Sequence, residues 1–347
     1  MSFKRILLGV ILVGLIGGGI FTYIAYGTFF TTNTSFNSDE EFVFIPTDAS
    51  ENDLEKGLSP LLKDFETFKS AANRKGYLSN IKAGRYKITK GMNNNEIVNS
   101  LRSGNLPVKV SFNNQESVND LAGRIASQIE ADSTSLLAAF KDEEFLNSNG
   151  FNEDNLISLY IPNSYEFFWN TSAKAFRDRM LKEYNRFWND ARIEKAKTLG
   201  LKPNEVIALA SIVHKETAKV DERPTVAGVY LNRMKKGMLL QADPTVIYAI
   251  KKETGNFDTI IKRVLYRDLE MDSPYNTYKY AGLPPGPIAM PDITAIDAVL
   301  NPKKHNYYYF VANVEKFGYH MFAENLTQHN RNKEQYIRWI NAQKINR

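Results

Sequence analysis

The chain has 347 residues, of which 43% are hydrophobic and 12% aromatic, so it is long enough for one or two packed domains. Its 44 basic and 39 acidic residues are spread along the chain without a basic block of the kind that binds nucleic acid. The absence of cysteine excludes disulfides, thiolate nucleophiles and cysteine-based metal sites, and the four histidines form no HExxH motif, so we expect no metal or other cofactor.

A membrane span is predicted at residues 6–26, where ILLGVILVGLIGGGIFTYIAY runs without a charge for the length that crosses a hydrocarbon core. The tip formed by residues 1–5 contains two basic residues, and the next basic residue is Lys56. The positive-inside rule therefore predicts a cytoplasmic tip and a single-pass chain whose remainder lies outside the cytoplasm. A cleaved signal peptide is the alternative, but its apolar core would be shorter and followed by an A-x-A-like site.

A small α+β module is predicted at residues 41–112, after a polar linker at residues 27–40. Its expected elements, in chain order, are a strand at 41–47, a helix at 52–73, a strand at 83–92, an Asn-capped helix at 94–101 and a strand at 106–112. The stretch GRYKITKGMNNNEIVNSLRSG within it resembles a LysM-like module, whose β-α-α-β fold binds N-acetyl sugars. A generic α+β spacer is the alternative interpretation.

Helices dominate the predicted second domain, residues 113–347, which makes the whole chain an α+β protein with short β elements. Helical periodicity predicts helices at 117–130, 133–140, 172–188 and 191–199, and a further one from Pro203. The helical pattern weakens after Gly237. Two paired strands are then predicted at 307–311 and 318–322, around a Glu-Lys turn, and a closing helix at 324–345.

The most informative helix is predicted within PNEVIALASIVHKETAKV, residues 203–220. Apolar residues recur at i, i+3 and i+4 from Leu209, and Glu216 takes the i+7 position of the same face. Burial would raise the pKa of this carboxyl, and a carboxylic acid that is protonated near neutral pH can protonate the leaving oxygen of a glycosidic bond. The alternative is that the helix ends near Glu216 and the side chain points to water. His214 and Lys215 fall off the face and are expected to meet solvent.

Three later segments have the chemistry of a sugar-binding cleft: QADPT, YNTY and GLPPGP. Tyrosine offers an apolar ring face and a polar tip, and a Pro/Gly loop forms a rigid wall at low entropic cost. Each segment is also compatible with an ordinary turn. The residues expected to contact substrate are Gln241, Asp243, Thr245, Tyr275, Asn276, Thr277, Tyr278 and Pro285.

A family resemblance rests chiefly on two runs, ASIVHKETAKVDERPTVAGVYLNRMKKGMLLQADPTVIYAI and SPYNTYKYAGLPPGPIAMP. These resemble the YceG-like endolytic murein transglycosylase family, and so do LYIPNSYEFFWNTSA and YYYFVANVEKFGYHMFAENLTQHN, so the resemblance extends over nearly the whole chain. It implies that Glu216, in the KET triplet, is the catalytic residue and that QADPT and YNTY line the cleft. The chain departs from the family at His214, where relatives often have Glu or Gln, and at Met290 and Asp292.

The resemblance implies a lytic transglycosylase that cuts the MurNAc–GlcNAc bond within nascent peptidoglycan strands without water. The 6-hydroxyl of the muramic acid attacks C1, and the resulting 1,6-anhydro end limits strand length. The implied location is the bacterial cytoplasmic membrane, with the catalytic domain on its outer side and membrane-bound peptidoglycan synthases as candidate partners. Two alternatives stay open: a muramidase-type hydrolase with Asp243 as the second carboxylate, and a non-catalytic, membrane-tethered glycan-binding scaffold.

Overall fold

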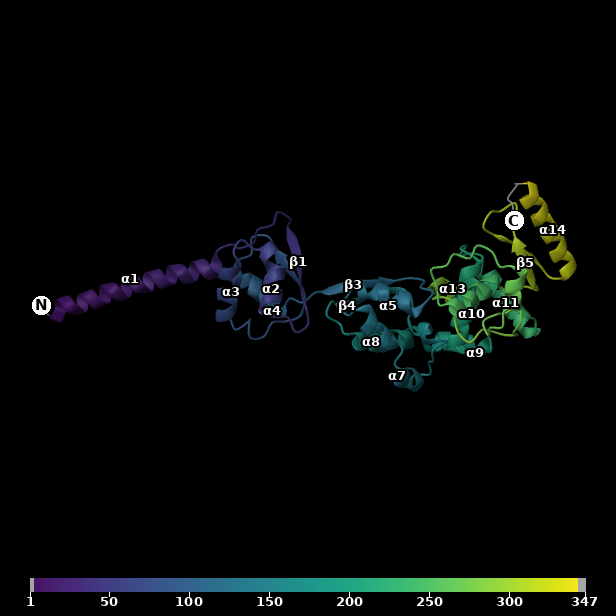
Figure 1. The fold of residues 1–347 in the computed structure, drawn as a ribbon, viewed down its shortest axis with the longest axis horizontal. Coiled ribbons are helices and arrows are strands. Elements are labelled where there is room, and N and C mark those ends of the chain that lie inside the picture. Colours follow the sequence, from purple (N-terminus) through teal and green to yellow (C-terminus); the bar gives the residue numbers. More distant parts are fainter. Residues whose placement is uncertain (1–2, 343–347) are drawn as a thin grey trace. The chain divides into compact units, whose positions relative to one another are not determined.

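The computed structural model describes residues 3–342, which form two compact units (Figure 1). The first unit contains the chain up to Val110 together with Ser127–Ala131 and Tyr165–Ser172, and the second unit contains the rest. Helices predominate, and the strands form three two-stranded sheets among the described residues. The predicted mixture of helices and short β elements is therefore confirmed.

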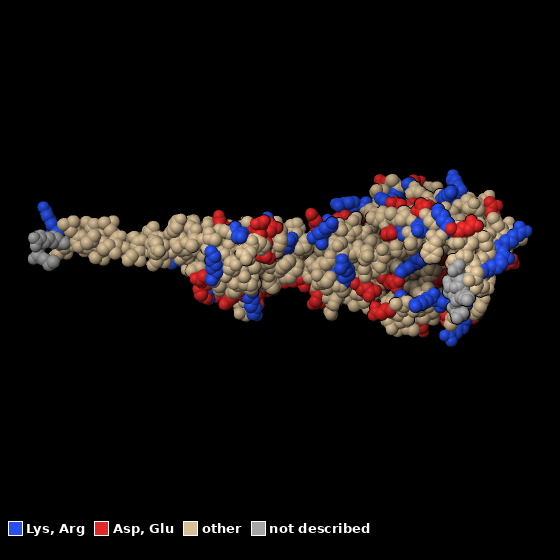
Figure 2. Space-filling model, turned by 90° about the horizontal axis from the view of Figure 1, so that it is seen from above, with Lys and Arg blue, Asp and Glu red and all other residues tan. Residues whose placement is uncertain are grey.

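The chain opens with one long apolar helix, α1 (Phe3–Phe30). Its stretch Ile6–Phe30 is long and apolar enough to cross a membrane, and none of it is buried within the structure. Figure 2 shows this rod without a charged side chain beyond its first turn. Near its C-terminal end the helix contacts α3 and α4, and the side-chain amide of Asn94 donates to the carbonyl of Thr28 at 2.8 Å. A long helix that is apolar on all sides and exposed along most of its length is typical of a membrane span. The helix continues to Phe30, into the stretch predicted as a linker.

The rest of that stretch packs onto the first unit. Asn33 and Thr34 are buried. The side-chain amide of Asn33 donates to the carbonyl of Asp64 at 2.8 Å and to Oδ1 of Asn94 at 2.7 Å. A buried amide with satisfied hydrogen bonds holds its backbone in place, so this segment is part of the unit, although its composition is that of a loop.

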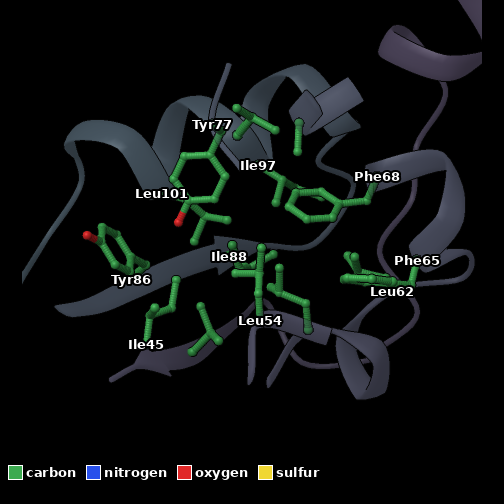
Figure 3. Packing of buried hydrophobic residues seen from close by; sticks show 14 residues of the cluster. Ile45, Leu54, Leu62, Phe65, Phe68, Tyr77, Tyr86, Ile88, Ile97 and Leu101 are labelled. Carbon is green, nitrogen blue, oxygen red and sulfur yellow. The ribbon is translucent and has the colours of Figure 1, made fainter. Parts of the chain in front are cut away.

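The first unit is built on an antiparallel pair, β1 (Glu40–Ile45) with β2 (Gly84–Thr89), in which Val43 lies opposite Tyr86. Three helices cover it: α2 (Glu51–Leu58), α3 (Phe65–Arg74) and α4 (Asn94–Ser103). The single helix predicted at 52–73 is wrong, because Pro60 stands in a 3₁₀ turn, Ser59–Leu61, that separates α2 from α3. Figure 3 shows how Phe68, Ile88 and Leu101 meet in the core between sheet and helices.

The second unit is mainly helical. Its helices are α5 (Val118–Ala126), α6 (Ser133–Phe140), α7 (Glu143–Ser148), α8 (Ala173–Phe187), α9 (Asp190–Thr198), α10 (Pro203–Glu216), α11 (Arg223–Lys235), α12 (Asp243–Thr254), α13 (Ile293–Leu300) and α14 (Leu326–Ala342), with 3₁₀ turns at Leu156–Leu159 and Tyr266–Glu270. Most predicted helices are confirmed, although α5 ends four residues early and residues 343–345 of the closing helix lie outside the described part. The sequence did not predict α7, α12 or α13.

The remaining four strands form two two-stranded sheets. Strand β3 (Pro107–Phe112) pairs with β4 (Asn163–Phe168), and β5 (Tyr309–Ala312) pairs antiparallel with β6 (His320–Ala323), as the sequence predicts for the second sheet.

Helix α10 is the centre of the second unit (Figure 1). Every residue from Val206 to Val213 is buried, and the helix packs against α11, α12 and α13. Pro203 in its first turn has the fixed φ that suits a helix start. Because the middle of the helix is enclosed on all sides, its position is rigid, and the residue at its C-terminal end is held accurately.

Candidate active site

The carboxyl of Glu216 lies at the C-terminal end of α10, where the backbone turns extended at Thr217. The helix therefore ends there, as the alternative interpretation expected, but the side chain does not point to open water. Glu216 is half-buried, and its Oε1 accepts a hydrogen bond from the hydroxyl of Tyr230 at 2.6 Å. The prediction that Glu216 continues the inward face of the helix is confirmed.

Burial raises the pKa of Glu216 to about 7. Four neighbours modify this effect: the hydrogen bond from Tyr230 and the charges of His320 and Arg233 lower the pKa, whereas the negative charge of Asp243 raises it. Near neutral pH both protonation states are then accessible, which allows one residue to give a proton and later take one back.

Helix α11 supplies the groups behind this carboxyl. Tyr230 is 1% exposed, and burial together with the nearby Glu216 raises its pKa well above the usual value, so it remains a neutral donor. Arg233 lies one turn later on the same face. Its guanidinium donates to the carbonyls of Tyr308 at 2.6 Å and Leu240 at 2.7 Å, and so ties α11 to two other parts of the site.

The QADPT and YNTY segments lie side by side and are joined by hydrogen bonds. The backbone N–H groups of Gln241 and Ala242 donate to the carbonyl and the hydroxyl of Thr277, both at 3.0 Å. The hydroxyls of Thr245 and Thr277 lie 2.9 Å apart, and both residues are buried. These two threonines therefore hold the loop against the start of α12. The predicted QADPT turn is in fact the entry to that helix, with Asp243 as its first residue.

Two further predicted site residues also lie inside the protein. The side-chain amide of Asn276 donates to the carbonyls of Leu269 and Met271 at 2.8 and 2.9 Å. The hydroxyl of Tyr275 lies 3.2 Å from Oδ1 of Asp154, and its ring packs against Tyr248. Both residues are buried, and their contacts brace the loop from within.

The remaining members of these segments reach the surface near Glu216. The hydroxyl of Tyr278 donates to Oδ1 of Asp243, and the charge of Asp243 is close enough to act on Glu216. Gln241 adopts a left-handed backbone with φ 52°, which costs a non-glycine residue free energy and is common at functional sites. Its side-chain oxygen accepts from Arg233 at 3.3 Å.

Pro285 lies apart from this group. It is exposed and lines a pocket of about 430 Å³ together with Pro203 and Asn204 of the first turn of α10. Glu216 is at the other end of that helix, about 20 Å away along its axis. The structure thus does not bring Pro285 to the carboxyl.

The prediction that His214 meets solvent is wrong. Its side chain is only 17% exposed, with Nδ1 3.4 Å from the carboxylate of Asp292 and 3.3 Å from Arg223. Asp292 also caps α13 and binds the buried guanidinium of Arg223. These contacts hold α13 against the end of α10 and keep the His214 side chain turned toward Asp292 and Arg223. Met290, the other departure from the family pattern, is buried and bonds through its backbone to Gln115. Lys215 is exposed and binds Glu116.

The sequence did not identify the pair formed by Glu222 and His320. The backbone N–H of His320 donates to Glu222 at 2.7 Å, and its ring Nδ1 lies 2.9 Å from the other carboxylate oxygen. Burial raises the pKa of Glu222, but the hydrogen bonds from His320 outweigh it and hold that pKa below its usual value. The predicted strand at 318–322 placed His320 correctly, but no local pattern gave its partner.

Comparison with known proteins links most of the chain to one family. The model of the YceG-like family matches residues 43–335. An endolytic murein transglycosylase of Bacillus subtilis (strain 168) is 31% identical over 324 residues, which cover 88% of this chain and 85% of that protein. The enzyme of the same name from Streptococcus pneumoniae serotype 2 is 33% identical over 177 residues, 51% of this chain and 31% of that protein. The crystal structure of a yceG-like protein from Listeria monocytogenes is 28% identical, with a TM-score of 0.57, and the match covers 85% of this chain and 99% of that one.

Proposed function

The chain belongs to the YceG-like family, and from this premise we propose that it is an endolytic murein transglycosylase with Glu216 as its catalytic residue. It cleaves the MurNAc–GlcNAc bond of peptidoglycan strands without water and leaves 1,6-anhydro-MurNAc ends, which limits strand length. The observation that carries the role of Glu216 is its pKa of about 7 beside a buried phenol donor.

In the reaction Glu216 first donates a proton to the substrate and then accepts one from it. Protonated Glu216 gives its proton to the glycosidic oxygen while the bond from that oxygen to C1 of the muramic acid breaks. The 6-hydroxyl oxygen of the same sugar bonds to C1, and its proton passes to the Glu216 carboxylate. Glu216 returns to its starting state, and no water is consumed. A single carboxyl suffices because the two transfers occur in sequence.

The surrounding residues take supporting parts in this proposal. Tyr230 donates to Oε1 of Glu216, which leaves the other oxygen to carry the proton. Gln241, Asp243 and Tyr278 reach the surface and contact the glycan strand. Thr245, Tyr275, Asn276 and Thr277 act indirectly, because their buried contacts fix the loop that presents the first three.

Residues 41–112 are proposed to form a LysM-like, glycan-binding module. Its order of strand, two helices and strand, with β1 antiparallel to β2, supports a β-α-α-β arrangement. The basic residues in the first turn of α1, Lys4 and Arg5, support a cytoplasmic N-terminus, with the chain beyond α1 on the outer side of the membrane. Membrane-bound peptidoglycan synthases are the proposed partners, since they extend strands at the same membrane. A pull-down from solubilised membranes that recovers no synthase would contradict this.

The activity is tested by digesting purified peptidoglycan with the full chain in detergent and reading the products by mass spectrometry. Wild type is expected to give anhydro ends, which lack one water relative to reducing ends, and Glu216→Gln none. Reducing ends would instead indicate hydrolysis, with Asp243 as the second carboxylate. No cleavage by either protein, together with retained glycan binding, would favour the scaffold.

A further inference from the structure

A groove beside Glu216 is lined by residues to which the proposed reaction gives no role. A pocket of about 430 Å³ is lined by Lys215 and Pro244, which adjoin Glu216 and Asp243 in the chain. A second pocket of about 270 Å³ adjoins it, and Glu116, Tyr248 and Phe257 line both. All of these residues belong to the second unit. Together the pockets form an elongated groove, which we call the side groove, of the size that small-ligand sites have.

The side groove combines an apolar floor with paired charges. Ile247, Tyr248 and Ile288 contribute to the floor, and Ile260 stands 82% exposed at the edge. Together these side chains offer a continuous apolar contact to a ligand.

The charges of the side groove lie in two sets. Next to Glu216, the carboxylate of Glu116 binds both Lys215 and Lys251, which leaves one positive charge in excess. Asp258 stands at the exposed outer edge of this part. Farther along, Lys252 binds Asp154 at 2.6 Å, and Lys141 and Glu153 also line this part. Such a surface matches a ligand that has small apolar groups throughout. Its end next to Glu216 would carry a carboxylate, and its far end would carry charges of both signs.

The part of the side groove next to Glu216 fits a bare sugar poorly. Saccharides are bound through amide and hydroxyl side chains that match their many hydroxyls. Among the described residues that line the first part of the groove, none is Asn or Gln. The ligand is therefore expected to be a substituent of the sugar.

We propose that the side groove binds the peptide stem of the muramic acid residue whose C1 bond is cut. This inference rests on the proposed function. The stem is attached through the lactyl ether of that same sugar ring, so its first atoms must lie within a sugar's width of Glu216. Its small alkyl side chains suit the floor, and its carboxylates and ammonium group suit the paired charges. The enzyme then selects stem-bearing strands over stripped ones.

The test compares two substrates that differ only in the stem. Glycan strands with intact stems and strands stripped by an amidase are given to the full chain in detergent, and new anhydro ends are counted by mass spectrometry. We expect kcat/KM to be about tenfold higher on stem-bearing strands, the effect of one or two good contacts. Lys251→Met and Ile260→Ser should lower the rate on stem-bearing strands toward that on stripped strands. Ile260→Ser changes an exposed side chain, so it should fold normally.

Matched controls separate this effect from general damage. Lys195→Met removes a lysine of α9 that donates to the side chain of Asn301, and Leu326→Ser removes an apolar side chain exposed at the start of α14. Both should keep the preference for stem-bearing strands.

The proposed function and this inference fail in different ways. Anhydro ends formed equally fast on both substrates would overturn the inference and leave the function intact. If no anhydro ends form on either substrate, the side groove is tested by the binding of fluorescently labelled strands to Glu216→Gln. About tenfold tighter binding of the stem-bearing strand, lost in the double variant with Ile260→Ser, supports the side groove, and equal binding overturns it.

Discussion

Two glutamates on either side of the loop between α10 and α11 sit in similar surroundings and behave in opposite ways. Burial raises the pKa of both Glu216 and Glu222. Glu222 accepts hydrogen bonds from the backbone and the ring of His320, and its pKa falls below the usual value. Glu216 accepts one from the neutral phenol of Tyr230 and faces the negative Asp243, and its pKa rises to about 7.

Burial alone therefore does not make a catalytic acid. A buried carboxyl that is well supplied with donors stays ionised and acts as a strut, here between the α10–α11 loop and β6. The same group with few donors keeps its proton up to neutral pH.

The largest expected effect is on activity. Glu216→Gln should slow the formation of anhydro ends by about 10³-fold, because its side chain can neither give nor take the proton. Glu222→Gln is the matched control, with the same chemical change a short distance away. It should retain activity within about tenfold, measured at equal amounts of folded protein. An equal loss of activity in both variants would show that Glu216 has no catalytic role that Glu222 lacks.

The second effect is on stability. The folded pKa of Glu216, about 7, exceeds the unfolded value of about 4.3, so between these values the folded chain holds a proton that the unfolded chain has lost. The free energy of unfolding therefore falls as pH rises through this window. Glu216→Gln should raise it by about 2 kcal/mol at about pH 8 and change it little at about pH 4. Thermal melts at both pH values measure this, and a destabilised variant at the higher pH would contradict it.

The third effect concerns the donor. Tyr230→Phe should lower kcat/KM about tenfold, because the carboxyl loses the bond that orients it. Since that bond also lowers the pKa of Glu216, the decline of kcat/KM at alkaline pH should move to higher pH. The pH profile of the variant beside wild type is the measurement. A shift to lower pH would show that Tyr230 does not act through Glu216.

The strut gives a smaller effect of opposite sign. The folded pKa of Glu222 lies below its unfolded value, so its contribution is present above about pH 4.3 and is lost as pH falls through the folded pKa. Glu222→Gln should therefore lower the free energy of unfolding by about 1 kcal/mol at about pH 7, and by less in acid. Thermal melts that show the same deficit at both pH values would rule out a charged strut.

The smallest effect marks where the site ends. Pro285→Ala changes an exposed residue at the far end of α10, so kcat/KM should stay within about twofold of wild type. A tenfold loss in a steady-state assay would place the GLPPGP loop on the path of the glycan.

The helical periodicity around Leu209 was enough to predict α10 and the inward position of Glu216. Helix α13, ITAIDAVL, was missed because a short helix that is apolar on most sides has no amphipathic period. The composition of YNTY indicated a site, but it could not tell that Tyr278 faces outward while Asn276 faces inward. Glu222 and His320 are 98 residues apart, and only the fold reveals that they meet.

The most direct test of the account is the titration of Glu216 itself. Carboxyl ¹³C chemical shifts of glutamate-labelled full chain in detergent would be followed through neutral pH, with Glu216→Gln to assign the signal and Glu222→Gln as the control. We predict one carboxyl that titrates near pH 7, present in Glu222→Gln and absent from Glu216→Gln. If every glutamate in the protein is already ionised by about pH 5.5, close to the range of unperturbed carboxyls, Glu216 is not the acid that the structure indicates.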